Sequence, residues 1–308
     1  MASNHPPLTP SGRPSPGSVA GHFNIAGGLL LLLGTLLAGL FLTGFVTAGV
    51  DVMIPGHTRT ALLVTSATQA VLAFILPAVV SWRIMGTKPL QALCADKGFS
   101  LSALAGIILI YFASVPAMDQ IVCWNEHISF GGALSGLEET LRKMEEMNGA
   151  VGETLMETTS IGGLVSGIAV IGILTGIAEE FFFRGGMQRM LTLNGVNRHI
   201  AVWVTAFVFS AIHFQFFGFF PRLLMGAWFG YILLWTRSVW ASATAHALNN
   251  SMVVVITWMS LRGLLPEGIR ESGFASEGFP WLCIASAIVT TLLIAFGKFF
   301  KTRNHAND

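Results

Sequence analysis

Long apolar stretches recur along the chain, and they constrain its fold more than any other feature. A helix that crosses a bilayer needs roughly 20 apolar residues. Stretches of about this kind lie near residues 24–50, 60–82, 101–122, 160–182, 199–214, 221–236, 239–260 and 279–298. Because lipid cannot satisfy exposed backbone groups, helices are the expected form of these segments. The sequence therefore predicts an all-α fold, a polytopic membrane helix bundle of about eight transmembrane helices.

The composition agrees with a membrane-embedded chain. Of the 308 residues, 53% are hydrophobic and 11% are charged, whereas soluble domains are about 25% charged. The net charge of +1 gives no strong field that would attract nucleic acid. The three cysteines, Cys94, Cys123 and Cys283, lie far apart and predict neither a disulfide framework nor a thiolate metal site. The lipid bilayer is therefore an expected partner, and nucleic acid is not.

The ends of the chain differ from its middle. Residues 1–22 are rich in Pro, Ser and Gly, which is typical of a disordered tail. The first apolar stretch is long enough to span, so we interpret it as a retained helix rather than a cleaved signal. Residues 23–300 are expected to form a single integral-membrane domain, followed by a basic C-terminal tail at 301–308.

The distribution of Lys and Arg predicts the orientation. With the N-terminus in the cytoplasm, most of the 17 basic residues fall on the cytoplasmic side of the eight spans. We therefore expect an integral, multi-pass membrane protein with its N-terminus and C-terminus cytoplasmic. In a bacterium it would lie in the cytoplasmic, or inner, membrane.

One long extramembrane loop, 123–159, interrupts the spans. Apolar residues recur in it at helical spacing, with charged residues between them. These apolar residues are Leu134, Leu137, Leu141, Met144, Val151 and Leu155. The loop is expected to contain an amphipathic helix, docked on the bundle or lying on the far membrane face.

Ionisable residues inside the fourth span are the first candidates for function, because such groups are expensive at membrane depth. Glu180 and Arg184 are four residues apart, so they share a helix face and can pair. Glu179 is turned by about 100° from Glu180 and can point elsewhere. An ionised carboxylate without a partner is costly in hydrocarbon. A wet cavity would accommodate Glu179 and would suit a general base. Alternatively, both glutamates are structural.

Of the 8 histidines, only His213 and His246 lie deep in apolar stretches. Phe209 precedes His213 by four residues, and Asn250 follows His246 by four, so each pair shares a helix face. A histidine and an amide at this spacing provide two donors aimed at a common point, as an oxyanion hole requires. The same groups could instead join helices by hydrogen bonds.

The three polar patterns together resemble the signature of a known family. The motifs E-E-x-x-x-R, F-x-x-x-H and H-x-x-x-N occur here in order as Glu179-Glu180 with Arg184, Phe209 with His213, and His246 with Asn250. In this the chain resembles the CAAX prenyl protease and bacteriocin-processing (CPBP, ABI) family of glutamate intramembrane endopeptidases. The resemblance extends over roughly residues 160–260.

The resemblance implies a conical bundle of eight helices with an intramembrane polar cavity open to the cytoplasm. It also implies that Glu179 and His213 activate a water without a metal, and that His246 and Asn250 stabilise the oxyanion. Glu180 and Arg184 would support the site, as would Phe209. On this interpretation the chain is a peptidase that needs no cofactor and no metal, and its partner is a peptide or protein substrate at the membrane.

Three other interpretations remain open at this point. A zinc-dependent membrane protease could use Glu179, His213 and His246 as ligands, although no H-E-x-x-H motif is present. A non-catalytic membrane scaffold or immunity protein would need the polar residues only for structure. A transporter would also need buried charges, but the sequence shows neither two matching halves nor paired broken helices.

Overall fold

The computed structural model describes residues 24–54, 58–265 and 280–296, and these residues contain no strand. The first part of the chain forms α1 (Ile25–Met53), α2 (Arg59–Gln69), η2 (Ala70–Ile75), α3 (Leu76–Ile84), α4 (Pro89–Ala92), α5 (Leu101–Glu126), η3 (Gly132–Leu134) and α6 (Ser135–Met156). The second part forms α7 (Ile161–Gly167), η4 (Ile168–Leu174), α8 (Thr175–Glu180), η5 (Phe181–Gln188), α9 (Arg189–Leu193), α10 (Arg198–Ala211), η6 (Phe216–Gly218), α11 (Phe219–Thr236), α12 (Val239–Leu261) and α14 (Pro280–Phe296).

In the described part of the chain, five helical stretches are long and apolar enough to cross a membrane, which confirms a polytopic helical bundle. They are Ile25–Met53, Arg59–Ile84, Leu101–Glu126, Ile161–Leu193 and Phe216–Thr236. The other three expected spans are also helical. Two of them, α10 and α14, are shorter apolar helices, and α12 has 23 residues that include His246 and Asn250. The tails expected at 1–22 and 301–308 lie outside the described residues.

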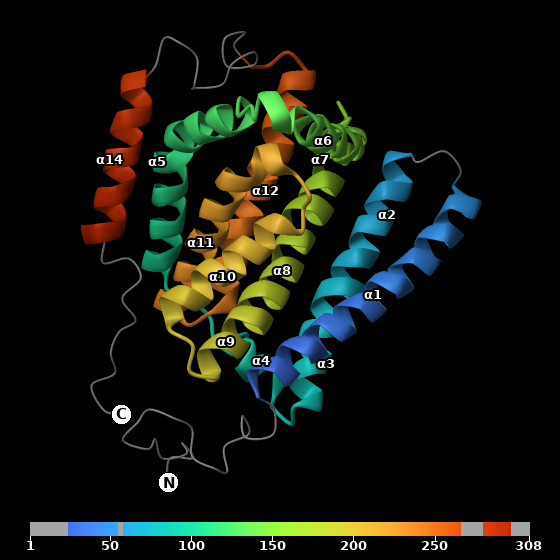
Figure 1. Cartoon of the computed structure of the whole chain (residues 1–308), viewed down its shortest axis with the longest axis vertical. Coiled ribbons are helices and arrows are strands. Elements are labelled where there is room, and N and C mark those ends of the chain that lie inside the picture. The colour runs from blue at the N-terminus through green and yellow to red at the C-terminus, as the bar shows by residue number, and fades with distance from the viewer. Residues whose placement is uncertain (1–23, 55–57, 266–279, 297–308) are drawn as a thin grey trace.

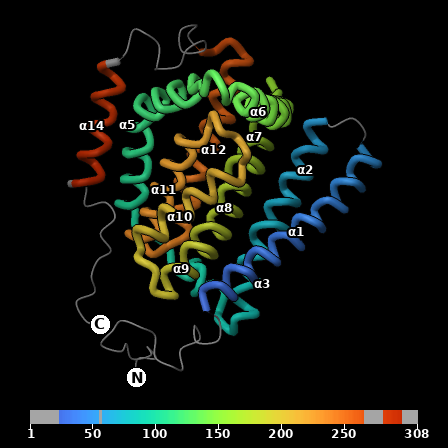
Figure 2. Tube along the Cα trace, in the orientation of Figure 1, coloured from blue at the N-terminus to red at the C-terminus, as the bar shows by residue number. Residues whose placement is uncertain are grey.

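The helices form a central group with others on both sides (Figure 1). In the middle, α8, α10, α11 and α12 pack together, with the strongest contacts between α10 and α11 and between α12 and η4. On one side α14 packs against α5, and on the other α1 packs against α2, η2 and α3. The trace shows the second half of α5 running across one end of this group and α6 lying next to it at the same end (Figure 2).

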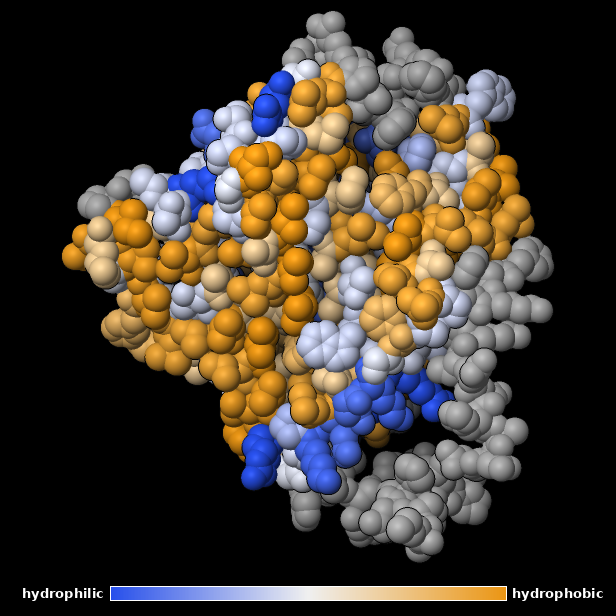
Figure 3. All heavy atoms as spheres, turned by 180° about the vertical axis from the view of Figure 1, so that it is seen from behind, coloured by the Kyte–Doolittle hydropathy of each residue, from blue (hydrophilic) through white to orange (hydrophobic). Residues whose placement is uncertain are grey.

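Much of the outer surface is apolar, as expected for a lipid-facing bundle. Seen from behind, hydrophobic residues cover the middle of the molecule, and hydrophilic residues gather toward its lower and upper edges (Figure 3). Large side chains such as Phe41 and Trp281 are exposed, at 68% and 80%. Lipid is the environment in which such surface carries little cost.

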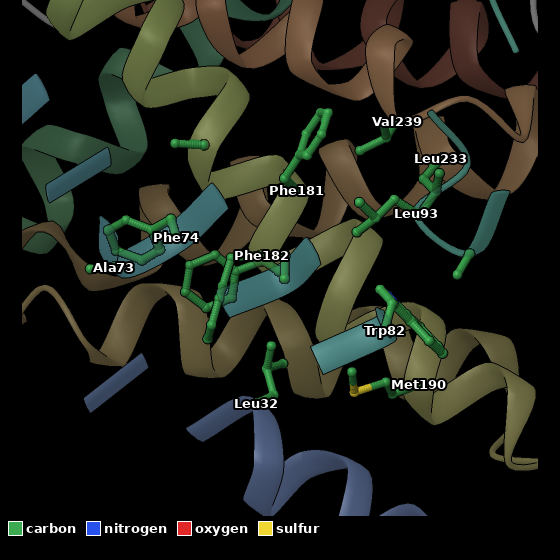
Figure 4. Close-up of a cluster of buried hydrophobic side chains, with 14 of the residues drawn as sticks. Leu32, Ala73, Phe74, Trp82, Leu93, Phe181, Phe182, Met190, Leu233 and Val239 are labelled. Atoms are coloured by element: carbon green, nitrogen blue, oxygen red, sulfur yellow. The ribbon is translucent and has the colours of Figure 1, made fainter. Parts of the chain in front are cut away.

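Aromatic and aliphatic side chains fill the space between α1, η2, α3 and η5 (Figure 4). Phe74 meets Phe182 edge to face with ring centroids 5.6 Å apart. The Trp82 indole N–H donates to the Gly185 carbonyl at 3.0 Å. Since lipid is as apolar as these side chains, close packing and buried hydrogen bonds, rather than removal from water, hold helices together here.

The amphipathic helix expected in the 123–159 loop is α6, and it docks on the bundle. The Glu145 carboxylate accepts a hydrogen bond from the Phe217 N–H at 2.9 Å, and the Arg142 guanidinium lies 4.0 Å from the centre of the Phe217 ring. Near the start of α6, hydrogen bonds from the Phe130 N–H, the Ser129 hydroxyl and Arg142 lower the pKa of Glu138. These contacts hold α6 over one end of the bundle.

The fourth span is one continuous helical stretch, Ile161–Leu193, in which π-helical turns lie on both sides of α8. Short π segments are rare and often occur at functional sites. Gly176 lies on the face of α8 that contacts α12. A Cβ atom there would be 3.0 Å from the Ala247 backbone nitrogen. The missing side chain therefore allows α8, which carries Glu179 and Glu180, to approach α12, which carries His246.

We predict that Gly176→Ala destabilises the protein by about 1–3 kcal/mol, as overpacking typically does, because backbone atoms of α12 would have to move. Gly162→Ala, in the same helical stretch, is the matched control, since a Cβ there meets nothing within 4 Å. Thermal unfolding of the purified proteins in detergent measures both effects. Equal unfolding temperatures for the two variants would contradict the predicted close contact.

Candidate active site

Glu180 is the centre of a fully buried hydrogen-bond network. Its Oε1 atom lies 2.8 Å from Nη1 of Arg184 and 2.9 Å from Nδ1 of His246. Its Oε2 atom accepts a hydrogen bond from the Ser242 hydroxyl. Glu180 and Arg184 have no exposed surface. The pairing of Glu180 with Arg184 that their spacing predicts is therefore confirmed, and it joins α8 and η5 to α12.

Arg184 extends this network to α11. Its Nη2 atom donates to the Gly226 carbonyl at 2.8 Å. One turn further along, the Gln188 amide donates to the Gly230 carbonyl at 3.0 Å. The Arg184 guanidinium also lies 4.7 Å from the centre of the Phe209 ring, in the range of a cation–π contact. Two polar side chains thus fix α11 against η5.

His246 lies between the two glutamates. Its Nδ1 atom faces Glu180, and its Nε2 atom lies 3.6 Å from Oε2 of Glu179. Because an ionised carboxylate only accepts hydrogen bonds, Nδ1 carries a proton that it donates to Glu180. The ring stacks on Phe229, with centroids 4.6 Å apart. Glu180 and Phe229 therefore fix both the orientation and the tautomer of His246.

His213 is oriented by Phe209 through both backbone and ring. Its Nδ1 atom lies 2.7 Å from the Phe209 carbonyl oxygen. A carbonyl only accepts, so Nδ1 carries the proton, and in the neutral ring Nε2 is left as an acceptor. The Phe209 ring meets the rings of His213 and His246 with centroids 5.1 and 5.7 Å apart. The phenylalanine of the F-x-x-x-H motif thus packs between the two imidazoles.

Asn250 lies one turn after His246 on α12. Its amide nitrogen donates to the Ile171 carbonyl at 3.3 Å, and its oxygen accepts from Asn249 at 3.2 Å. The second proton of its amide has no partner in these contacts. Asn250 is therefore positioned by η4 and by its neighbour, and it keeps a donor for another group.

Glu179, His213, His246, Asn250 and Phe209 all line one cavity of about 580 Å³. Glu180 and Arg184 are not in its lining; they lie behind it. The structure thus brings together residues from α8, the end of α10 and α12 that are far apart in the sequence. Of the two glutamates, Glu179 is held less tightly, since its contact with the His246 Nε2 atom is 3.6 Å long.

The cavity lies at the end of the bundle that α6 covers. Its walls include the second half of α5, from Tyr111 to Glu126, and the first half of α11, from Pro221 to Phe229. Glu145 and Met156 of α6 also line it. In Figure 1 this is the upper end of the molecule. Lys88, Lys97 and other basic residues belong to loops at the opposite end.

Several residues of the site have no counterpart in the sequence motifs. Ser242 precedes His246 by four residues, so its place on the same face of α12 could have been found from spacing. Phe229, beneath His246, and the residues contributed by α5 and α6 could not, because nothing in their local pattern separates them from ordinary packing residues. Among the described residues, no three His, Cys, Asp or Glu side chains gather in a way that could hold a metal ion.

The fold and the site define a polytopic membrane protein in which buried acidic and imidazole groups surround one cavity. Residues 161–252 match the family model of the Rce1-like type II CAAX prenyl endopeptidases. The matched segment contains Glu179, His213, His246 and Asn250. Over this segment, about a third of the chain, the protein is similar to the type II CAAX prenyl endopeptidases, and its long apolar helices fit an integral membrane protein. No curated protein and no solved structure matches it significantly.

We predict that Arg184→Met destabilises the protein by about 3–5 kcal/mol, because it leaves the Glu180 charge buried without its cation. Glu180→Gln combined with Arg184→Met should be milder, since the neutral amide removes that charge. Lys143→Met is the control, because its pair with Glu139 is exposed and should contribute about 0–1 kcal/mol. Unfolding in detergent compares the three proteins. A double variant no more stable than Arg184→Met would contradict this interpretation.

Proposed function

We propose that the protein is an intramembrane glutamate endopeptidase that hydrolyses a peptide bond without a metal, using water activated by Glu179 and His213. The observation that supports this most strongly is the shared cavity, into which α8, the turn after α10 and α12 contribute an acid, two imidazoles and an amide. General bases of this kind typically contribute 10²- to 10⁴-fold to rate.

The roles proposed for Glu179 and His213 follow from the contacts that each side chain makes. Glu179 has only the 3.6 Å contact with His246, and His213 presents Nε2 as an acceptor because Nδ1 is held by Phe209. In the proposed step a water between them loses a proton to Glu179 and attacks the peptide carbonyl carbon. The proton is then passed to the amide nitrogen as the carbon–nitrogen bond breaks. His213 accepts a hydrogen bond from the water and orients it.

The oxyanion that forms on the carbonyl oxygen needs donors in fixed positions. Asn250 offers the amide proton that Ile171 does not use. His246 offers a second donor, Nε2–H, when its ring carries two protons. Glu179, 3.6 Å away, is the neighbour that can supply this proton. Glu180, Arg184 and Phe209 support the site by holding these side chains. The substrate is proposed to be a membrane-associated peptide or a C-terminal peptide segment.

A zinc protease is the second candidate that uses the same residues. Zinc sites in hydrolases have three protein ligands at about 2.0–2.3 Å. In the described part of the chain no such group of His, Cys, Asp or Glu side chains occurs, and His246 uses Nδ1 for Glu180. These observations favour metal-independent water activation. Full cleavage after dialysis against a strong zinc chelator is the expected result.

We predict that Glu179→Gln and His213→Gln each reduce cleavage at least 10²-fold while the proteins stay folded. Glu146→Gln, on the exposed side of α6, is the matched control and should retain wild-type cleavage. Peptide termini in membranes from cells with each variant, compared by mass spectrometry, provide the measurement. Termini that persist unchanged in the Glu179→Gln cells would exclude this mechanism, and a non-catalytic scaffold would then be favoured.

We also propose that both termini lie in the cytoplasm, as the bias of Lys and Arg indicates. This topology has a consequence for the cavity. With α1 and α5 leaving the cytoplasmic side, α6 lies toward the opposite face of the membrane, and the cavity, whose wall includes Glu145 and Met156 of α6, lies near that face. The family resemblance implies a cavity open to the cytoplasm, so the proposed orientation needs a direct test.

Labelling with a membrane-impermeant maleimide tests the orientation. Lys88→Cys and Asn148→Cys, at opposite ends of the bundle and both exposed, are introduced separately into protein whose three cysteines are replaced by serine. We expect Asn148→Cys to react in intact cells and Lys88→Cys to react only after lysis. The reverse pattern would place α6 and the cavity on the cytoplasmic side.

A further inference from the structure

Arg222 lies in the wall of the catalytic cavity, although it belongs to none of the three motifs. It is in the first turn of α11. Its Nη2 atom donates to Oε1 of Gln215 at 2.6 Å. Its Nη1 atom is buried and has no hydrogen-bond partner. A buried donor left unsatisfied costs about 1–3 kcal/mol, and more when it is charged. An unsatisfied charged donor beside a reaction site indicates a group that a ligand completes.

The charges around Arg222 show what kind of ligand fits. Among the described residues that line the cavity, it is the only Lys or Arg, and the acidic residues are Asp119, Glu126, Glu145 and Glu179. Glu145, on α6, accepts a hydrogen bond from the Phe217 N–H, and both Glu145 and Glu179 attract the Arg222 charge electrostatically. The guanidinium therefore keeps a free edge in a cavity whose walls otherwise repel anions.

The local backbone holds this guanidinium in one place. A Cβ atom on Gly218 would lie 3.2 Å from Nη2 and 3.6 Å from Nη1 of Arg222. The glycine therefore lets the side chain lie flat against the turn that follows His213, while Gln215 fixes its orientation. A guanidinium prepared in this way loses little entropy when it binds a ligand.

We propose that Arg222 binds a carboxylate of the substrate and so determines which peptides are cleaved. The proposal rests on the peptidase function proposed above. A guanidinium matches a carboxylate in planar, paired hydrogen bonds, and such charge-assisted bonds are about twice as strong as neutral ones. The carboxylate comes either from the C-terminus of the peptide or from an Asp or Glu side chain. In both cases Arg222 holds the peptide while Glu179 and His213 act on a bond nearby.

Binding to a variant without turnover tests this assignment separately from catalysis. The background is Glu179→Gln, and the probes are three fluorescent apolar hexapeptides. One has a free C-terminal carboxylate, one has a C-terminal amide, and one has a C-terminal amide and an internal Asp. We expect one of the two carboxylate peptides to bind at least about tenfold more tightly than the neutral amide peptide. Which one binds identifies the source of the carboxylate.

Adding Arg222→Gln to this background should remove the preference and leave affinity for the neutral peptide unchanged. Arg222→Lys, which keeps the charge but not the planar fork, should restore only part of it. Gly218→Ala, which displaces the guanidinium without removing it, should also weaken the preference. Unfolding in detergent confirms that each variant is folded. Equal or undetectable binding of all three peptides, or a preference that survives Arg222→Gln, would overturn the proposal, whatever the cleavage assays show.

Discussion

The buried contact between Glu180 and Arg184 is the interaction on which the rest of the site depends. Glu180 forms an ion pair with Arg184 and accepts hydrogen bonds from His246 and Ser242. Arg184 in turn donates a hydrogen bond to the Gly226 carbonyl. One ion pair thus links the fourth span to α11 and α12. Burying two charges is costly, and the attraction between them compensates only when the remaining donors and acceptors are satisfied. Here the partners of the ion pair include His246, which is itself a residue of the site. The ion pair therefore determines where His246 points.

Close helix packing makes this network possible. Without a side chain at Gly176, the backbones of α8 and α12 come within contact distance, and Glu180 reaches His246 and Ser242 directly. Phe209 has a corresponding role on α10. Its ring lies against Arg184 and both imidazoles, and its carbonyl holds His213. Glu180, Arg184 and Phe209 thus each support a neighbouring residue of the site.

The sequence predicted the helical class, the positions of the five long apolar helices and the pairing of Glu180 with Arg184, because these depend on local hydropathy and on spacing along one helix. It also grouped Glu179, His213, His246 and Asn250, but only through the resemblance to a family. It could not predict that Phe229 stacks under His246, or that α5 and α6 form much of the cavity wall, because those contacts join segments with no shared pattern. For the same reason it did not identify Arg222. The bias of Lys and Arg predicts only the orientation of the helices. Where the cavity lies along them depends on contacts between helices, which the sequence alone does not show.

The two adjacent glutamates show how one short segment can provide both a structural and a chemical group. Glu180 has three donors on its two oxygens and no exposed surface, so protonating it would leave the buried Arg184 charge without its counter-ion and would set a new O–H donor against these donors. It is therefore unsuited to gain and lose a proton during a reaction. Glu179 is turned toward the cavity, has one longer contact with His246, and can change its protonation without breaking the framework. Catalytic acids and bases are commonly assigned by such differences in environment. This difference is why we propose Glu179 as the base, while Glu180 holds fixed the histidine that faces it.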